Sequence, residues 1–133
     1  LLEHGADVSS SDSLGWKPMN YASSNGHIDL IAQLLAHGAD RNSWDKDGDT
    51  TVAHAAAGGH HATVSYLLDR GASIDPVGEY GFTPLMVASA RGHVAAVSTL
   101  LNRGAECTIR DNRGRTALMI AEENGHEATV LIL

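Results

Sequence analysis

Residues 81–105 read GFTPLMVASARGHVAAVSTLLNRGA, and this stretch predicts a pair of short helices. Thr83 and Pro84 mark the start of the first helix, because a threonine hydroxyl caps a helix well and proline fits the first helical position. Small and apolar residues recur at helical spacing up to Arg91, where we expect this helix to end. Gly92 can adopt the positive φ of a tight reversal, so a second helix can follow closely.

The second helix is predicted over 94–102, where Val97, Leu100 and Leu101 recur three and four residues apart. Gly104 ends it, and a polar loop follows. Helices this short are marginal in water, where about 12–15 residues are needed. Their stability must therefore come from packing against neighbouring helices.

The same pattern recurs with a 33-residue period that no insertion or deletion interrupts. Glycine-histidine pairs, leucine pairs and single alanines repeat in step, at Gly26-His27, Gly59-His60, Gly92-His93 and Gly125-His126, at Leu1-Leu2, Leu34-Leu35, Leu67-Leu68 and Leu100-Leu101, and at Ala22, Ala55, Ala88 and Ala121. A strict period of this length is the signature of stacked repeats, each of which is one small supersecondary unit.

The run Gly81–Ala88, followed by Gly92-His93 and by the segment Val97–Ala105, resembles the ankyrin repeat. The resemblance covers essentially the whole chain and implies an all-α ankyrin-repeat solenoid, in which stacked helix-turn-helix units carry projecting loops. The family's histidine after T-P-L is missing in every copy, where the residues are Asn20, Ala53, Met86 and Met119. The hydrogen bond that this histidine usually gives to the threonine must be absent or replaced.

We expect one continuous array rather than separate domains. Its parts are the tail of a preceding repeat at 1–11, full repeats at 12–44, 45–77 and 78–110, and a truncated repeat at 111–133. Both ends of the chain fall inside a helix of the pattern, so we expect an internal segment of a longer array. The repeat at 45–77 has Thr51 in place of the proline and Gly58 in its first helix, and we expect it to be the least stable.

Composition limits what this 133-residue chain can bind. Apolar residues make up 43% and charged residues 19%, as in a folded domain, but aromatic residues are scarce, so small side chains must fill much of the core. A net charge of -7 argues against nucleic acid and anionic membranes as partners, and no apolar run reaches the roughly 18–20 residues of a membrane span. A single cysteine, Cys107, excludes a disulfide framework and fits an intracellular location, cytoplasmic or nuclear.

No catalytic residue, cofactor or metal site is predicted. Four of the eight histidines belong to the Gly-His pairs, and the resemblance implies that these bond to the backbone of neighbouring loops. His54 and His61 have no further ligand at metal-binding spacing. Asp45, Asp47 and Asp49 resemble the start of a calcium loop, but the pattern lacks its final glutamate, which predicts an ordinary solvated loop. We expect Cys107 to be partly buried and unreactive, because no neighbour is placed to lower its pKa.

One histidine occupies an apolar position of the repeat. His54 falls in a column otherwise filled by Tyr21, Val87 and Ile120, which predicts a buried, neutral imidazole. Burial disfavours the charged form and lowers the pKa below the unfolded value of about 6.5. We therefore expect the repeat at 45–77 to lose stability as the pH falls below about 6.5.

The columns that vary between copies indicate a binding surface. The resemblance implies that loop tips and the outer side of the first helices line one concave face. The few aromatic residues cluster at these tips, as binding anchors do, although Trp16 and Phe82 can alternatively pack against adjacent loops. The predicted partner-binding residues are Trp16, Trp44, Asp47, Asp49, Tyr80, Phe82, Arg91, Arg113 and Arg115.

These features predict a non-catalytic protein–protein interaction module within a larger scaffold, sensor or regulatory protein. Its partner is expected to be another protein, with no nucleic acid, membrane or small-molecule substrate. The alternative is a structural spacer or regulatory array attached to a catalytic, channel or nucleotide-binding domain. A fold does not determine function, so both alternatives stay open.

Overall fold

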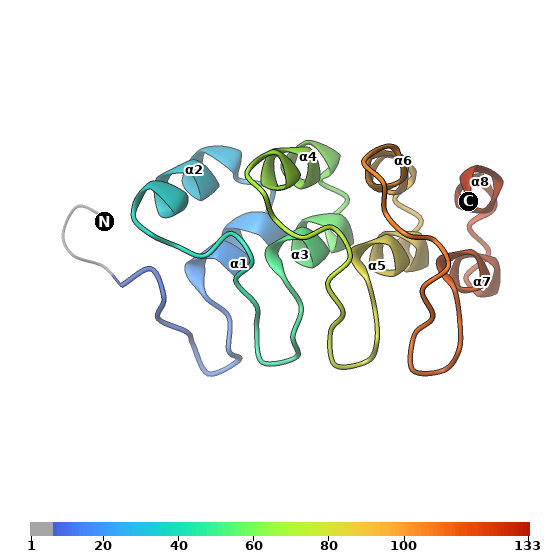
Figure 1. Cartoon of the computed structure of the whole chain (residues 1–133), viewed down its shortest axis with the longest axis horizontal. Helices are drawn as coiled ribbons and strands as arrows, with labels where there is room; N and C mark the ends of the chain where they lie inside the picture. The colour runs from blue at the N-terminus through green and yellow to red at the C-terminus, as the bar shows by residue number, and fades with distance from the viewer. Residues whose placement is uncertain (1–6) are drawn as a thin grey trace.

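The computed structural model describes residues 7–133, and these form eight helices in four helix-turn-helix pairs. The pairs are α1 (Pro18–Ser24) with α2 (Ile28–Ala36), α3 (Thr51–Ala57) with α4 (His61–Asp69), α5 (Pro84–Arg91) with α6 (Val94–Asn102), and α7 (Ala117–Glu123) with α8 (Glu127–Ile132). Figure 1 shows the pairs stacked side by side in chain order, which confirms the predicted all-α solenoid. Of the predicted tail at 1–11, residues 1–6 lie outside the described part.

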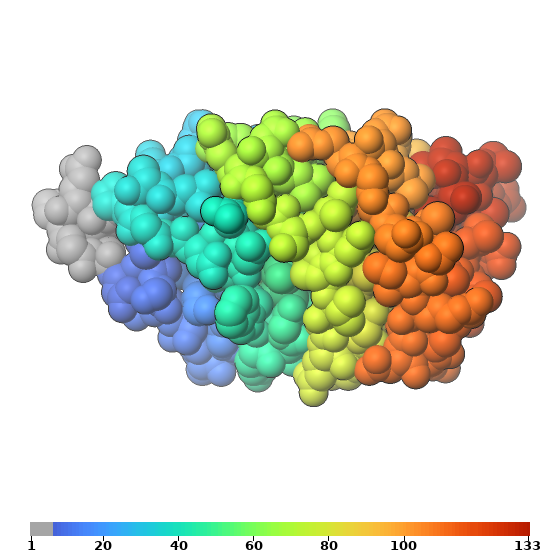
Figure 2. Space-filling view, viewed as in Figure 1, coloured from blue at the N-terminus to red at the C-terminus, as the bar shows by residue number. Residues whose placement is uncertain are grey.

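The helices form two rows. Successive first helices pack on one another, α1 on α3, α3 on α5 and α5 on α7, and the outer row continues from α4 through α6 to α8. Four loops project from the inner row on one side (Figure 1). In the space-filling view of Figure 2 the copies appear as adjacent bands, from blue at the N-terminal end to red at the C-terminal end.

Each first helix begins with a polar cap. Threonine hydroxyls accept the backbone amide three residues later at the start of α3, α5 and α7, at 3.3 to 3.5 Å. In α1 the cap position holds Lys17, and the side chain of Asn20 takes over. Its oxygen accepts the Lys17 amide at 2.9 Å, and its nitrogen donates to the Ser43 carbonyl at 3.2 Å. Asn20 stands where the family histidine is missing, so in this copy the lost contact is replaced.

The Gly-His histidines tie consecutive pairs together. The Nε2 atoms of His60, His93 and His126 donate to the carbonyls of Ser24, Ala57 and Ala90, at 3.0, 3.1 and 2.9 Å. Each acceptor lies in the last turn of the first helix of the preceding copy. The structural hydrogen bonds that the resemblance implied are present for these three histidines, but their acceptors are carbonyls at helix ends rather than in loops.

The core is a continuous strip between the two rows. The alanine column, Ala22, Ala55, Ala88 and Ala121, is at most 1% exposed. Because alanine has so small a side chain, successive inner helices can approach closely. Branched residues of the second helices, such as Val64 and Leu67, are fully buried from the other side.

The repeat at 45–77 is better packed than its sequence predicts. Gly58 is the C-cap residue of α3 and lies outside the helix, so its expected helix-weakening effect does not apply. An added Cβ at Gly58 would lie 2.5 Å from the His60 ring, which explains why a glycine stands there. Thr51 is buried, and its hydroxyl donates to the Arg41 carbonyl at 2.6 Å, a bond that proline could not make.

Candidate partner-binding groove

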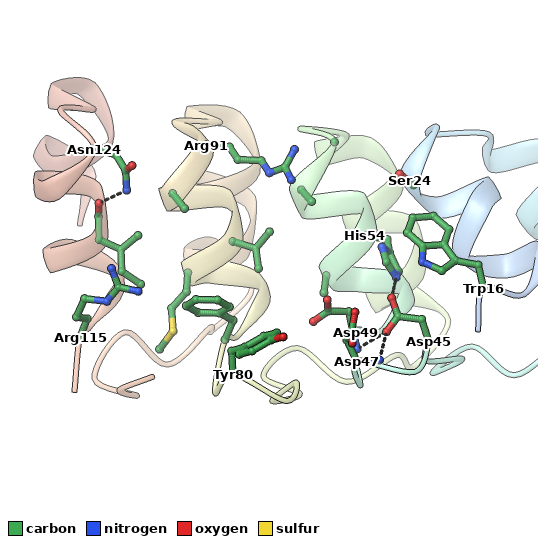
Figure 3. A pocket seen from close by; sticks show the side chains of 18 residues that line it. Trp16, Ser24, Asp45, Asp47, Asp49, His54, Tyr80, Arg91, Arg115 and Asn124 are labelled. Carbon is green, nitrogen blue, oxygen red and sulfur yellow. Dashed lines mark hydrogen bonds and ion pairs between the residues drawn. The ribbon is translucent and has the colours of Figure 1, made fainter. Parts of the chain in front are cut away.

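A groove of about 550 Å³ runs along the inner row from α1 to α7. Its floor is formed by the first helices and its wall by the inward side of the loops (Figure 3). The lining that bears on recognition consists of Trp16, Asp45, Asp47, Asp49 and His54 toward the N-terminal end, and of Tyr80, Phe82, Arg91 and Arg115 toward the C-terminal end.

Seven of the nine predicted binding residues line this groove, namely Trp16, Asp47, Asp49, Tyr80, Phe82, Arg91 and Arg115. Trp44 does not, because it pairs with Thr50 in a short antiparallel bridge and successive side chains of an extended arm alternate in direction. Its indole is 54% exposed, and the ammonium of Lys17 lies 5.3 Å from the ring centre. Arg113 lies exposed in the turn at the tip of its loop and does not line the groove either.

The aromatic residues that line the groove differ in how far their side chains are exposed to solvent. Tyr80 is 59% exposed, as expected for an anchor. Trp16 is half-buried, with its ring centre 4.3 Å from that of His54 and 4.9 Å from that of Tyr21. Phe82 is also half-buried, because it packs against the core as well as against Tyr80. Trp16 and Phe82 therefore combine the two alternatives left open for them, because each ring lines the groove and also packs within the fold.

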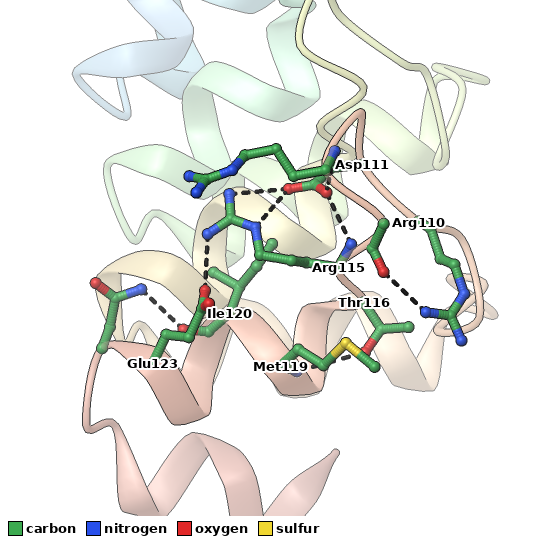
Figure 4. A network of polar contacts seen from close by, with 10 residues as sticks. Arg110, Asp111, Arg115, Thr116, Met119, Ile120 and Glu123 are labelled. Carbon is green, nitrogen blue, oxygen red and sulfur yellow. Dashed lines mark hydrogen bonds and ion pairs between the residues drawn. The ribbon is translucent and has the colours of Figure 1, made fainter.

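An aspartate directly precedes the turn at the tip of three of the four loops, at Asp12, Asp45 and Asp111. One oxygen of each accepts the backbone amides two and four residues later, at 2.8 to 3.1 Å. The other oxygen faces a donor side chain, which is the Tyr21 hydroxyl for Asp12, His54 for Asp45 and Arg115 for Asp111 (Figure 4 shows the last). Sequence reasoning missed this role, and the available signal was the spacing of the three aspartates in multiples of the 33-residue period.

The three carboxylates of the second loop are not equally solvated. Asp45 is only 4% exposed, so the solvated loop expected for this trio is wrong for that residue. Burial, with smaller contributions from the charges of Asp45 and Asp47, raises the pKa of Asp49 to about 6. No lysine or arginine among residues 7–133 forms an ion pair with Asp47 or Asp49.

The imidazole of His54 is 7% exposed, which confirms the predicted burial. Burial lowers its pKa, and the nearby Asp45 carboxylate opposes this effect in part. The Nε2 atom lies 3.1 Å from Oδ2 of Asp45 without the alignment of a good hydrogen bond. The ring is thus a mostly neutral wall of the groove, packed against Trp16.

The two basic residues of the C-terminal half differ in their availability. Arg115 forms ion pairs with Asp111 at 2.9 Å and with Glu123 at 2.7 Å, so its charge is compensated within its own copy (Figure 4). Arg91 is exposed and has no ion-pair partner in the described part of the chain. It points from α5 toward α3 above the groove (Figure 3).

The two titrating groups of the second repeat change stability with opposite signs. The pKa of His54 is lower in the folded chain than in the unfolded one, so its contribution is lost as the pH falls below about 6.5. The pKa of Asp49 is raised from 3.8 to about 6, so protonation of Asp49 adds stability as the pH falls from about 6 toward 3.8. The predicted acid weakening is therefore opposed by a neighbour that the sequence did not reveal.

We expect single substitutions to separate these two effects. Urea unfolding at pH 7.5 and pH 5.0 should show that His54→Val gains more stability on acidification than the parent, and that Asp49→Asn gains less or loses stability. His61→Val is the matched histidine control, since His61 is exposed at the start of α4 and does not line the groove. If all four proteins show the same change between the two pH values, neither group is a sensor. Hydrogen exchange of amides 50–68 against 83–101 would locate the change.

Other chemistry is sparse in the described residues. Within residues 7–133 no three histidine, cysteine or acidic side chains are arranged to hold a metal ion. Cys107 is exposed, so the expectation of a partly buried thiol is wrong. No helix in this part of the chain combines the length and the apolar character that crossing a bilayer requires.

Comparison with known proteins yields one family. A family model described as ankyrin repeats (3 copies) matches residues 1–77, 29–111 and 74–133, which together span the chain. A search of curated proteins finds no match.

Proposed function

This chain belongs to the ankyrin-repeat family, and from that premise we propose that it binds another protein through the groove along its inner row. Ankyrin repeats are generally protein–protein interaction modules and are typically non-catalytic. The observation that carries the proposal is the accessible lining, in which Tyr80 is exposed beside the half-exposed Phe82 and Val87. Exposed aromatics inside a concave surface are typical binding anchors.

The module acts within a larger scaffold, sensor or regulatory protein. A protein partner fits better than nucleic acid, because the net charge is -7 and three aspartates line the groove. The proposal includes no cofactor and no small-molecule substrate. An exposed, unpaired Cys107 suits the reducing interior of a cell, in the cytoplasm or nucleus.

The second candidate is a structural spacer or regulatory array beside a catalytic, channel or nucleotide-binding domain. The observation that favours it is the uniform tie between copies, made by the histidine bonds from His60, His93 and His126. Such a stack can hold an attached domain in a fixed position without any contact in the groove. A spacer predicts that groove substitutions leave all binding unchanged.

We expect Tyr80→Ala to weaken binding of groove-directed peptides by at least about fivefold, equivalent to roughly 1 kcal/mol, with little change in thermal stability. Tyr80 is exposed, and the ring contact found for it is with Phe82, so its removal leaves the core intact. Phe82→Ala should lower both affinity and stability, because its ring also packs on the core. The measurement is fluorescence anisotropy with linear twelve-residue peptides selected by display on the whole chain.

Val77→Ala serves as the control, because Val77 is 56% exposed and lies outside the groove. It should leave both affinity and stability unchanged. If Tyr80→Ala binds the selected peptides as well as the parent does, the ring is not an anchor.

A further inference from the structure

We propose that the groove takes an extended peptide segment whose arginine or lysine side chain is held by Asp47 and Asp49, next to an apolar side chain that packs on Tyr80 and Phe82. This inference rests on the proposed function, since it specifies the chemistry of the partner at the same groove. It follows from the charge of the second loop, from the rings on either side of it and from the position of Arg91.

The second loop carries negative charge that is not balanced within the fold. The carboxylate of Asp45 is used within the fold, because it accepts two backbone amides and faces His54. The carboxylates of Asp47 and Asp49 line the groove without a cationic partner in the described residues. Their neighbour His54 is buried and supplies little positive charge.

This charge imbalance has an energetic cost for the free protein. The raised pKa of Asp49 means that its ionised form is disfavoured in the free protein, through burial and through repulsion from Asp45 and Asp47. A cation that enters the groove would reverse the electrostatic part of this penalty. The free protein is thus already arranged for a positive charge at this position.

Aromatic rings flank the two carboxylates. In Figure 3 Asp47 and Asp49 lie between Tyr80 on one side and the tilted ring pair of His54 and Trp16 on the other. Aromatic faces attract guanidinium and ammonium groups, and carboxylates give charge-assisted hydrogen bonds to them. Rings flanking a carboxylate pair suit a long side chain with a charged head and an apolar stem, as arginine and lysine have.

The rest of the lining restricts where a cation can lie in the groove. Beyond Tyr80 the lining becomes apolar, with Phe82, Met86 and Val87, so it suits an apolar neighbour of the basic residue. Arg91 points toward α3 at the edge of the groove away from the loops (Figure 3), and its uncompensated positive charge repels a cation there. The basic side chain is therefore directed to the loop side of the groove, where Asp47 and Asp49 lie.

The test is a selection of linear twelve-residue peptides displayed in random sequence, with the whole chain as bait. We expect an arginine or lysine at one position of the selected pool, enriched at least fivefold over the input and followed by apolar residues. A synthetic peptide of that sequence should bind the variant Asp47→Asn/Asp49→Asn at least tenfold more weakly than the parent. Asp29→Asn, an exposed acid on α2 outside the groove, is the control that should bind normally.

A double-mutant cycle ties the effect to the carboxylates. Replacing the basic residue of the peptide by glutamine should weaken binding to the parent about tenfold and binding to the double variant hardly at all. The thermal unfolding of each variant is recorded in parallel, to show that the chain still folds.

The outcomes distinguish this inference from the proposed function. Selected peptides that lack a basic residue, or that bind the double variant as well as the parent, overturn the inference. If those peptides still lose affinity with Tyr80→Ala, the proposed function stands. Enrichment of acidic peptides that depend on Arg91 also overturns the inference alone. Peptides insensitive to every groove substitution, or a selection that yields no binder, contradict both.

Discussion

Leu67→Ala is expected to lower the free energy of unfolding by about 3 kcal/mol. Leu67 is fully buried on α4, which packs against both α3 and α6. Truncation therefore leaves a cavity between two copies that the surrounding helices can close only in part. Urea unfolding with linear extrapolation measures the loss.

The adjacent Leu68 provides the matched control. It is half-buried and packs on the edge of the core, so Leu68→Ala should cost only about 1 kcal/mol although the chemical change is identical. Equal losses at the two positions would mean that the stack relaxes around the cavity, and would contradict the continuous core described above.

Gly92→Ala is expected to cost about 3 kcal/mol, and Gly125→Ala only about 1 kcal/mol. Both glycines have positive φ, +69° and +72°, which an alanine adopts only with strain. At Gly92 the new Cβ would also lie 2.5 Å from Nδ1 of His126, whereas at Gly125 it would meet no atom within 4 Å. The difference between the two variants is thus the cost of displacing the His126 ring from its bond to Ala90.

Thermal and urea unfolding of both variants measure this difference. Combining Gly92→Ala with His126→Ala should cost less than the sum of the two single changes, because the ring can be displaced only once. If Gly92→Ala and Gly125→Ala lose the same stability, the clash with the ring is harmless and only the backbone strain remains.

Most of the fold could be predicted from the sequence because its determinants are local and repeated. The predicted second helix at 94–102 has the same bounds in the structure, and the predicted first helix ends at Arg91. The capping threonines, the reversing glycines and the apolar spacing each act within a few residues. The four copies also show this pattern independently, so the positions of the helices are indicated more than once.

The groove was predicted less completely, because its details depend on contacts between copies and on the register of the loops. Trp44 was misplaced since the direction of its side chain depends on the bridge to Thr50, which residue type does not encode. Asp45 is buried next to His54, and this contact forms only when the loop has folded back onto the helix. The raised pKa of Asp49 arises from burial and from two neighbouring charges, so only the folded chain reveals it.

The histidine ties also have a direction along the chain. The carbonyl of Ser24, near the end of α1, is bonded by His60, which follows it by 36 residues. During synthesis, the Ser24 carbonyl therefore lacks this hydrogen bond until the second repeat has left the ribosome. Each newly made repeat supplies the histidine that bonds to the first helix of the repeat before it. The array should consequently mature from its N-terminal end, one repeat behind translation.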